Sequence, residues 1–178
     1  MGNVIQLFDQ IAIERAIKRM AHQVIESQID LKTLVVVGIQ RRGVLIGQKL
    51  VEAIHQISGH HVTFGFLDIT FYRDDLSLLN HAPQVNATHI QTDINQQHIL
   101  LVDDVIYTGR TVRCAIEALF DMGRPRAIQL ACLIDRGHRE LPFRPDYVGK
   151  NVPTAKSERI EVAIEPLDDQ TAVLLHKD

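Results

Sequence analysis

Hydrophobic residues along the chain follow two patterns, one typical of helices and the other of buried strands. Apolar residues recur every three to four positions from Ile13 to Ile25, behind Asp9, which is a suitable N-cap. The same period runs from Val44 to Ile57 and from Val112 to Phe120, and a glycine follows each of these two runs. The pattern therefore predicts three amphipathic helices.

Short apolar runs between these helices predict β-strands. They lie at 34–37, 62–70, 99–102, 127–134, 159–164 and 171–175. Strands that alternate with helices indicate an α/β fold, in which a mainly parallel central sheet carries helices on both faces. Because ligands bind at the carboxyl ends of strands in such sheets, we expect a site in the loops after Val37, Val102 and Ile134.

Length and composition limit the classes of protein to consider. The 178 residues suffice for one domain with a sizeable core, and 46% hydrophobic and 23% charged residues are typical of a globular protein. A formal charge of −3 confines any RNA or anion site to a local patch. No apolar run approaches the ~18 residues of a membrane span, so we expect no membrane association.

The two cysteines, Cys114 and Cys132, lie in apolar segments with no His or Cys at ligand spacing. This spacing disfavours a zinc site or a disulfide, and it favours a reducing, cytoplasmic location. Because Cys114 falls among the apolar positions of a helix, we interpret it as a core residue rather than a nucleophile.

The segment ILLVDDVIYTGRT, from Ile99 to Thr111, carries the strongest chemical signal. Its strand delivers Asp103 and Asp104, adjacent carboxylates that suit hydrogen bonds from the vicinal hydroxyls of a sugar, or a Mg²⁺ shell. A Thr-Gly-Arg-Thr turn then opens a helix, and backbone N–H groups in such a turn cradle a phosphate. The two halves fit ribose 5-phosphate. The alternatives are a simple helix cap or the acidic residue of an NTPase, and no G-x-x-x-x-G-K-[ST] loop supports the latter.

A second candidate anion site follows the first predicted strand, where Arg41 and Arg42 lie between Gly38 and Gly43. A glycine-flanked loop with two arginines can bind an anion through backbone amides and guanidinium groups. A solvated basic turn is the alternative interpretation.

VDDVIYTGRT resembles the phosphoribosyl pyrophosphate (PRPP) signature of the type I phosphoribosyltransferases. Other segments narrow the resemblance to the PyrR family, pyrimidine-operon attenuation regulators that are also uracil phosphoribosyltransferases. These segments are Ala21-His22, Val37-Gly38-Ile39 with Arg42-Gly43, and the stretches 67–77, 123–142 and 146–154. The resemblance covers nearly the whole chain in order. It implies the type I phosphoribosyltransferase fold in a single domain, 1–178, with a small hood at about 135–178.

The resemblance also assigns residues to PRPP and UMP. Asp103 and Asp104 would hold the ribose hydroxyls and would act in catalysis with Arg42 and Arg73. The loop from Gly38 would bind pyrophosphate, and the loop from Tyr107 would bind the 5-phosphate. The implied PRPP- and UMP-binding residues are Gly38, Ile39, Gln40, Arg41, Arg42, Gly43, Asp103, Asp104, Val105, Ile106, Tyr107, Thr108, Gly109, Arg110, Thr111 and Arg136.

Two segments are expected to enclose this site. The polar stretch from Tyr72 to His89 has no periodicity and alone indicates an irregular surface loop. The resemblance makes about 71–89 a mobile lid, from which Arg73 reaches the pyrophosphate. It also makes Asp135-Arg136-Gly137-His138 part of the base-binding region, where Arg136 would contact the pyrimidine and backbone groups of the hood would read the base.

A basic stripe runs along the first predicted helix, where Arg15, Lys18, Arg19 and His22 share one face opposite the apolar stripe. A solvated outer face explains such a stripe on its own. The resemblance instead implies an RNA-binding surface. Its matching residues are Arg19, His22, His138, Arg144 and Lys150, whereas Lys18, Ser27 and Arg41 stand where other members have Thr, Arg and Thr.

The resulting hypothesis is a uracil phosphoribosyltransferase that converts uracil and PRPP to UMP and pyrophosphate. It would also bind pyrimidine-operon leader mRNA when loaded with UMP or UTP, and so regulate transcription by attenuation. Mg²⁺ would arrive with PRPP rather than at a metal site of the protein, and the resemblance implies a homodimer or higher homo-oligomer. Two alternatives stay open: a phosphoribosyltransferase for another base without RNA binding, and a non-catalytic nucleotide-sensing regulator.

Overall fold

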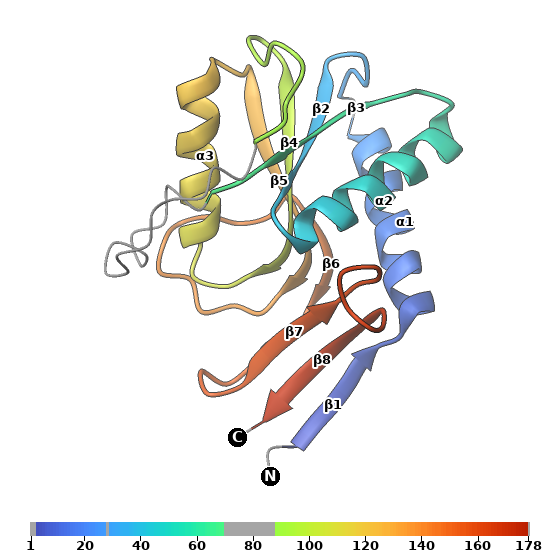
Figure 1. The fold of residues 1–178 in the computed structure, drawn as a ribbon, viewed down its shortest axis with the longest axis vertical. Coiled ribbons are helices and arrows are strands. Elements are labelled where there is room, and N and C mark those ends of the chain that lie inside the picture. Colours follow the sequence, from blue (N-terminus) through green and yellow to red (C-terminus); the bar gives the residue numbers. More distant parts are fainter. Residues whose placement is uncertain (1–2, 28, 70–87, 178) are drawn as a thin grey trace.

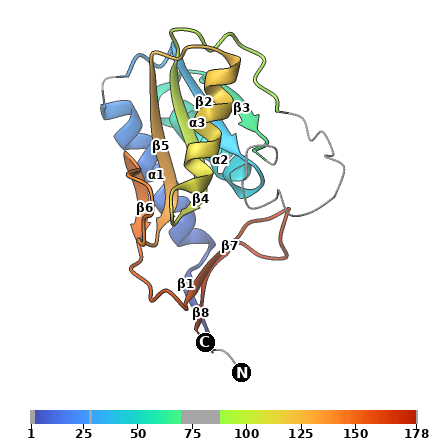
Figure 2. The same cartoon turned by 90° about the vertical axis from the view of Figure 1, so that its left-hand side faces the viewer.

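The computed structural model describes residues 3–27, 29–69 and 88–177, and a parallel five-stranded sheet lies at its centre. The strand order is β3-β2-β4-β5-β6. The strands are β3 (Thr63–Leu67), β2 (Leu34–Ile39), β4 (His98–Ile106), β5 (Ala127–Asp135) and β6 (Tyr147–Asn151). Figures 1 and 2 show α1 (Gln10–Glu26) and α2 (Arg42–Ser58) on one face of this sheet and α3 (Arg110–Met122) on the other. The predicted α/β fold is confirmed.

Local signals in the sequence set the helix ends. The Asp9 side chain accepts a hydrogen bond from the Ala12 N–H at 2.8 Å, as an N-cap does. Gly59 adopts φ 74° after α2, and its N–H donates to the His55 carbonyl at 2.8 Å. Both predicted helix boundaries are therefore confirmed by their caps.

The central strand β2 is buried on both faces. Leu34 and Val36 pack with α1 and α2, whereas Val35 and Val37 pack in a second core with α3. A strand covered on both faces needs apolar residues at every position, which explains the unbroken run in the sequence. These two cores fix the sheet between its helices.

A smaller antiparallel sheet of order β1-β8-β7 lies at one end of the molecule (Figure 1). Its strands are β1 (Asn3–Phe8), β7 (Arg159–Ala163) and β8 (Ala172–Lys177). The strands predicted at 159–164 and 171–175 are confirmed as β7 and β8. The range 135–178 expected for the hood contains β6 of the central sheet, and β1 joins the small sheet from outside that range.

Three features of the strands differ from the sequence prediction. β1 and β6 were not predicted, because β1 pairs only with distant β8, and Gly149 and Lys150 hide the apolar pattern of β6. The strand expected at 62–70 is shorter, from Thr63 to Leu67. β4 continues through the two carboxylates to Ile106, because its pairing with β5 extends to that residue. Long-range pairing rather than local pattern set these boundaries.

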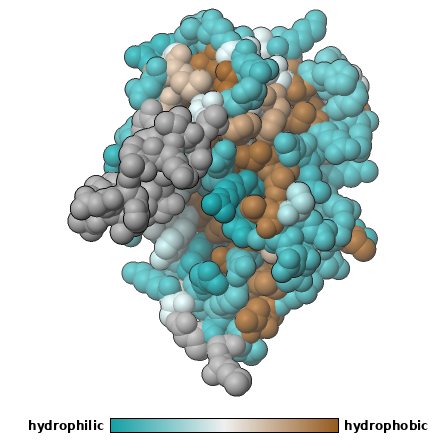
Figure 3. Space-filling model, viewed as in Figure 1, coloured by the Kyte–Doolittle hydropathy of each residue, from teal (hydrophilic) through white to brown (hydrophobic). Residues whose placement is uncertain are grey.

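The predicted lid at about 71–89 lies outside the described residues except for its last two. Where the described chain resumes, His89 exchanges backbone hydrogen bonds with Phe66 of β3, at 2.9 and 3.0 Å. Hydrophilic residues predominate on the face drawn in Figure 3, with hydrophobic patches between them. No helix among the described residues is long and apolar enough to cross a membrane.

Candidate active site

The candidate site lies where β2 ends beside β4. Their ladder stops at the pair Gly38 and Val102, after which β2 turns into α2 while β4 continues with Asp103 and Asp104. The chain passes from β2 to β3 on one side of β2, and then to β4 on its other side. Such a reversal of strand order opens a crevice at the carboxyl edge of a parallel sheet. The two carboxylates project from β4 at this edge.

Gly43 allows the loop after β2 to pack closely against β4, the strand that carries Asp103 and Asp104. A Cβ on Gly43 would lie 2.4 Å from the Val102 carbonyl oxygen and 3.2 Å from the Asp103 Cα. Only glycine permits this approach of α2 to β4. The Gln40–Arg41 peptide bond in the same loop is cis. The predicted pyrophosphate loop and ribose carboxylates are thus adjacent in space.

Asp103 is buried, and Asp104 beside it is partly exposed. Asp103 is 7% exposed, and its Oδ1 accepts the Asp104 N–H at 2.9 Å. Burial raises the pKa of Asp103 well above its ordinary value, and the neighbouring Asp104 charge raises it further. Burial also raises the pKa of Asp104, while the Arg42 charge opposes this shift. Hydroxyl donors from a ligand would offset the cost of keeping both groups ionised.

The thiols near this site are not nucleophiles. Cys132 on β5 pairs with Asp103 in the ladder, and burial followed by the Asp103 charge raises the pKa of this thiol well above its ordinary value. Cys114 is buried at 3% exposure, which confirms its prediction as a core residue.

The predicted phosphate loop leads into α3. Gly109 adopts φ 92° and precedes the helix, where it offers no side chain to cap the first turn. The Arg110 N–H donates to Thr108 Oγ1 at 3.4 Å, and N–H groups at a helix N-terminus can bind an anion. The Thr108 carbonyl accepts the N–H groups of Glu140 and Leu141, both at 3.0 Å. The segment after β5 therefore supports the phosphate loop through these two hydrogen bonds.

Arg42, a predicted pyrophosphate-binding residue, forms an ion pair with Asp168. Its Nη2 lies 2.7 Å from Asp168 Oδ1 and its Nε lies 3.0 Å from Oδ2. The hydrogen bond to Asp168 raises the pKa of Arg42, and it lowers the pKa of Asp168. A side-on pair of this kind leaves the Nη1 end of the guanidinium group for another acceptor.

Arg136 is likewise bound by protein groups. It is 7% exposed, and its guanidinium donates to Thr154 Oγ1 at 3.1 Å and to the Glu158 carbonyl at 2.7 Å. Its guanidinium carbon lies 4.2 Å from the centre of the Tyr107 ring. The contact between Arg136 and a pyrimidine stays a prediction, whereas the contacts present join the turn after β5 to the phosphate loop.

The other predicted site residues divide by exposure. Ile39 and Ile106 are 1% and 2% exposed, so only their backbone groups can face a ligand. Arg41 is exposed, and Arg110 forms an ion pair with Glu140 at 2.9 Å. Arg73 lies outside the described residues. The remaining predicted residues, Gln40, Val105 and Thr111, lie partly exposed in the two loops and at the end of β4.

Comparison with known proteins gives the family. The family model of the phosphoribosyl transferase domain matches residues 3–168. The chain is 53% identical over 172 residues to "Bifunctional protein PyrR" of Caldicellulosiruptor bescii, covering 97% of this chain and 94% of that protein. It is 49% identical over 174 residues to the protein of the same name in Bacillus subtilis, covering 97% and 96%. The chain belongs to the PyrR family.

Solved structures agree on the fold of this PyrR chain. A hypoxanthine phosphoribosyltransferase of Trypanosoma cruzi aligns with a TM-score of 0.72 at 18% identity, covering 97% of this chain and 95% of that one. A hypoxanthine phosphoribosyltransferase of Staphylococcus aureus gives 0.71 at 19% identity, covering 95% and 90%. At these identities the likeness concerns the fold alone.

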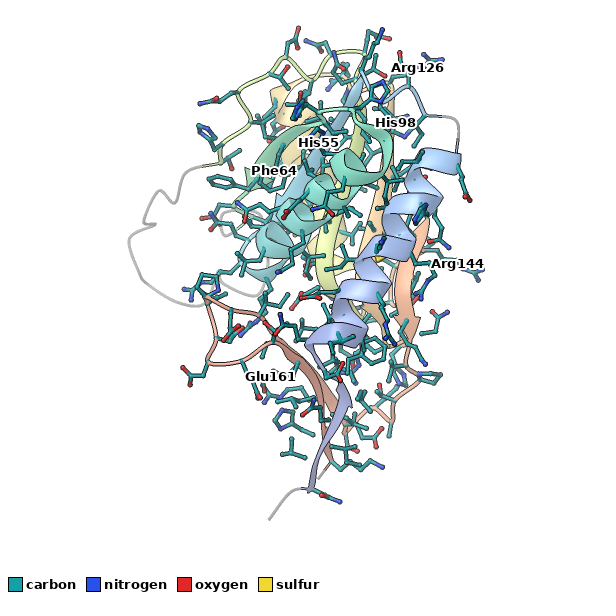
Figure 4. The ribbon with its side chains drawn as sticks, turned by 90° about the vertical axis from the view of Figure 1, so that its right-hand side faces the viewer. His55, Phe64, His98, Arg126, Arg144 and Glu161 are labelled. Carbon is teal, nitrogen blue, oxygen red and sulfur yellow. The ribbon has the colours of Figure 1, made fainter. Side chains whose placement is uncertain are left out.

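The predicted RNA-binding residues of this PyrR chain gather mainly around α1 and β6. Arg19 donates to the carbonyl groups of Gly149 and Val148, the latter at 3.5 Å, and Lys150 lies 5.7 Å from the centre of the Phe8 ring. His22 is exposed on α1, and Figure 4 shows Arg144 beside the same helix. His138 is different, because it is only partly exposed and its Nε2 lies 2.5 Å from the Thr154 carbonyl.

Sequence analysis missed the side chains that brace the PyrR site. Asp168 holds Arg42, and Arg139 donates to Asp135 Oδ2 at 2.6 Å and to the Tyr107 carbonyl at 3.0 Å. Neither residue was assigned a role from the sequence, although Arg139 lies within the stretch 123–142 that carries the resemblance. The available signal was the charged segment at the end of β5, where Asp135 had already been placed in the base-binding region.

Proposed function

We propose that this PyrR protein transfers the 5-phosphoribosyl group of PRPP to uracil, giving UMP and pyrophosphate. One observation supports this most strongly: Gly43 packs the predicted pyrophosphate loop against Val102 and Asp103. That contact joins two of three groups suited to PRPP, and the third follows β4 along the chain. They are an arginine loop, a carboxylate pair and a helix N-terminus.

The reaction requires no protein nucleophile. Uracil N1 forms a bond to C1 of the ribose as the bond from C1 to pyrophosphate breaks, and the N1 proton is released to solvent. The transition state carries positive charge on the sugar. Asp103 and Asp104 accept hydrogen bonds from the ribose hydroxyls, and their charge stabilises the cationic sugar. The first turn of α3 holds the 5-phosphate, and the loop from Gly38 to Gly43 binds the departing pyrophosphate. Rate enhancement arises from positioning and electrostatic stabilisation.

Mg²⁺ enters this proposal as part of the substrate, bound to the pyrophosphate group of PRPP. There it neutralises charge on the leaving group. The buried carboxylates fit a cationic neighbour, because a positive charge close to Asp103 and Asp104 would oppose the cost of their burial.

The second proposed activity is binding of pyrimidine-operon leader mRNA by the UMP-loaded protein. Arg19 and Lys150 support it, because both are exposed and Arg19 donates to the carbonyl of Gly149, the residue before Lys150. Basic side chains there would neutralise phosphates, and an exposed RNA loop would supply sequence-specific bases. The homo-oligomer and the cytoplasmic location remain predictions of the sequence.

A nucleobase panel tests the enzymatic proposal. Purified protein is incubated with Mg²⁺-PRPP and with uracil, hypoxanthine, guanine or adenine, and nucleotide products are separated by chromatography. We expect UMP from uracil and at most traces of the purine nucleotides. Efficient formation of IMP or GMP would favour a purine enzyme, and the absence of every product would favour a regulator that only senses nucleotides.

A further inference from the structure

The turn after β5 lies between the phosphate loop and the proposed RNA face, and we propose that it couples UMP binding to RNA binding through Thr154. This inference rests on the proposed function, since it explains how UMP at one site raises RNA affinity at another. Thr154 belongs to neither set of predicted binding residues.

Residues 136–139, which form the turn after β5, contact Tyr107, the first residue of the phosphate loop. The Tyr107 ring, in a residue 38% exposed, has the Arg136 guanidinium 4.2 Å from its centre and the His138 ring edge-on at 6.0 Å. Arg139 adds a hydrogen bond to the Tyr107 carbonyl at 3.0 Å. Any shift of Tyr107 when a 5-phosphate binds therefore acts directly on residues 136–139.

Thr154 binds both side chains that flank the Tyr107 ring. Its hydroxyl accepts from Arg136 Nε at 3.1 Å and donates to the Arg136 carbonyl at 3.4 Å. Its own carbonyl lies 2.5 Å from His138 Nε2. Because a carbonyl can only accept, Nε2 of His138 carries the proton in this contact. Thr154 is thus the point at which the turn joins the chain that follows β6.

That chain leads to the RNA face. Thr154 follows β6, whose Lys150 and Gly149 lie beside Arg19 of α1. The Val152 N–H donates to the Asp135 carbonyl at 2.8 Å, which holds the stretch between Lys150 and Thr154 against the end of β5. Contacts therefore continue from the phosphate loop to the basic residues.

The turn itself has an uncommon backbone conformation. Gly137 adopts φ 78° and His138 adopts φ 61°, and a residue other than glycine seldom occupies this left-handed region. The contacts of His138 with Thr154 and Tyr107 favour this conformation, so their loss would release it. A nucleotide that fixes Tyr107 selects the bound form of the turn and positions residues 149–154 for RNA.

Thr154→Val tests the coupling, because valine keeps the shape of threonine but removes the hydroxyl that joins Thr154 to Arg136, whereas the backbone contact of Thr154 with His138 remains. Thr154→Ser, which retains the hydroxyl, is the rescue variant. Thr171→Val is the matched control, since its Oγ1 accepts the Glu165 N–H at 3.2 Å in the β7–β8 loop. For each protein the dissociation constant for leader RNA is measured without UMP and with saturating UMP, and the ratio of the two values gives the coupling factor.

We expect the wild type, Thr154→Ser and Thr171→Val to share one coupling factor. The coupling factor of Thr154→Val should be smaller by at least about fivefold, which lies within the usual range of coupling between sites. RNA affinity without UMP should change little. A wild-type factor in Thr154→Val would overturn this inference alone. RNA binding by the wild type that ignores UMP would overturn the regulatory half of the proposed function as well, while the nucleobase panel still reports on the enzyme.

Hydrogen exchange on the wild type keeps the inference testable if Thr154→Val does not fold. UMP should slow amide exchange in residues 136–139 and 152–155, and linkage requires RNA to tighten UMP binding by the same factor. Unchanged exchange in both stretches on UMP binding would refute the proposed switch.

Discussion

Replacement of Gly43 by alanine would separate the pyrophosphate loop from the ribose carboxylates. The new Cβ would lie 2.4 Å from the Val102 carbonyl oxygen, where real Cβ contacts are essentially never below 3.0 Å and are ordinary from 3.4 Å. The Val102 oxygen is a backbone atom, so no side chain can rotate to make room. The loop must therefore retreat by roughly 0.6–1 Å from β4, a misplacement of the size that can lower an enzymatic rate about 100-fold.

The expected loss in kcat/KM for PRPP is thus about 100-fold, equivalent to about 2.7 kcal/mol of transition-state stabilisation. Overpacking should also lower the free energy of unfolding by about 1–3 kcal/mol. Steady-state kinetics of UMP formation and denaturant unfolding measure the two effects on the same protein.

Gly47→Ala is the matched control in the same helix. Its Cβ would lie 2.9 Å from Phe64 Cε2, which is a flexible ring edge rather than backbone. We expect this variant to keep kcat/KM within about threefold of the wild type, because a ring can shift where a backbone cannot. Equal kinetics for Gly43→Ala and the wild type would refute the proposed packing of the site.

Three further substitutions test the charges around the site. Asp104→Asn should lower kcat/KM by about 10–100-fold, because it removes about 1.5–3 kcal/mol of charge-assisted hydrogen bonding to the ribose. Its melting temperature should not fall, and unchanged kinetics would contradict the assignment of Asp104 to the ribose. Asp103 has a raised pKa in the folded state, so the free energy of unfolding falls as pH rises from the pKa of the unfolded state through that of the folded state. Asp103→Asn should therefore be more stable than the wild type at pH 7 but not at acidic pH. A destabilised variant at pH 7 would disprove this. Asp168 has a lowered pKa in the folded state, so its ion pair with Arg42 stabilises the protein at any pH above the pKa of the unfolded state. This stabilisation is lost as pH falls through the pKa of the folded state. Asp168→Asn should cost about 1 kcal/mol in urea unfolding at neutral pH, since the pair is partly solvent-screened, and no cost there would exclude a stabilising pair.

The sequence predicted those parts of the fold that local chemistry determines. The apolar run at 34–37 becomes β2 because both faces of that strand are covered, and Asp9 caps α1 as its position before the helix indicated. The carboxylate pair and the glycine turn were visible because their residues are contiguous on the strand and loop that present them.

Contacts between distant segments were not predictable in the same way. Asp168 follows Arg42 by 126 positions, and their pairing depends on how the β7–β8 loop meets α2. The hydrogen bonds of Arg136 to Thr154 and to the Glu158 carbonyl also join segments that lie 18 and 22 positions apart. β1 was missed because its hydrogen bonds go to the other end of the chain. Such pairings depend on three-dimensional packing, which cannot be predicted from residue type and spacing.

The central claim is that one PyrR chain carries a catalytic site and a separate RNA face. Its most direct test is to measure UMP synthesis and leader-RNA affinity on the same preparations of Arg19→Gln, Lys150→Gln and Arg126→Gln at several salt concentrations with UMP present. Arg126 is the control, since it is exposed and lies at the end of the molecule away from the small sheet (Figure 4). We predict that Arg19→Gln and Lys150→Gln bind RNA more weakly, with salt slopes lower by ~0.7 per lost phosphate contact, while all three variants retain UMP synthesis. Equal loss of RNA affinity in Arg126→Gln, or loss of UMP synthesis together with RNA binding in Arg19→Gln, would contradict two separate sites.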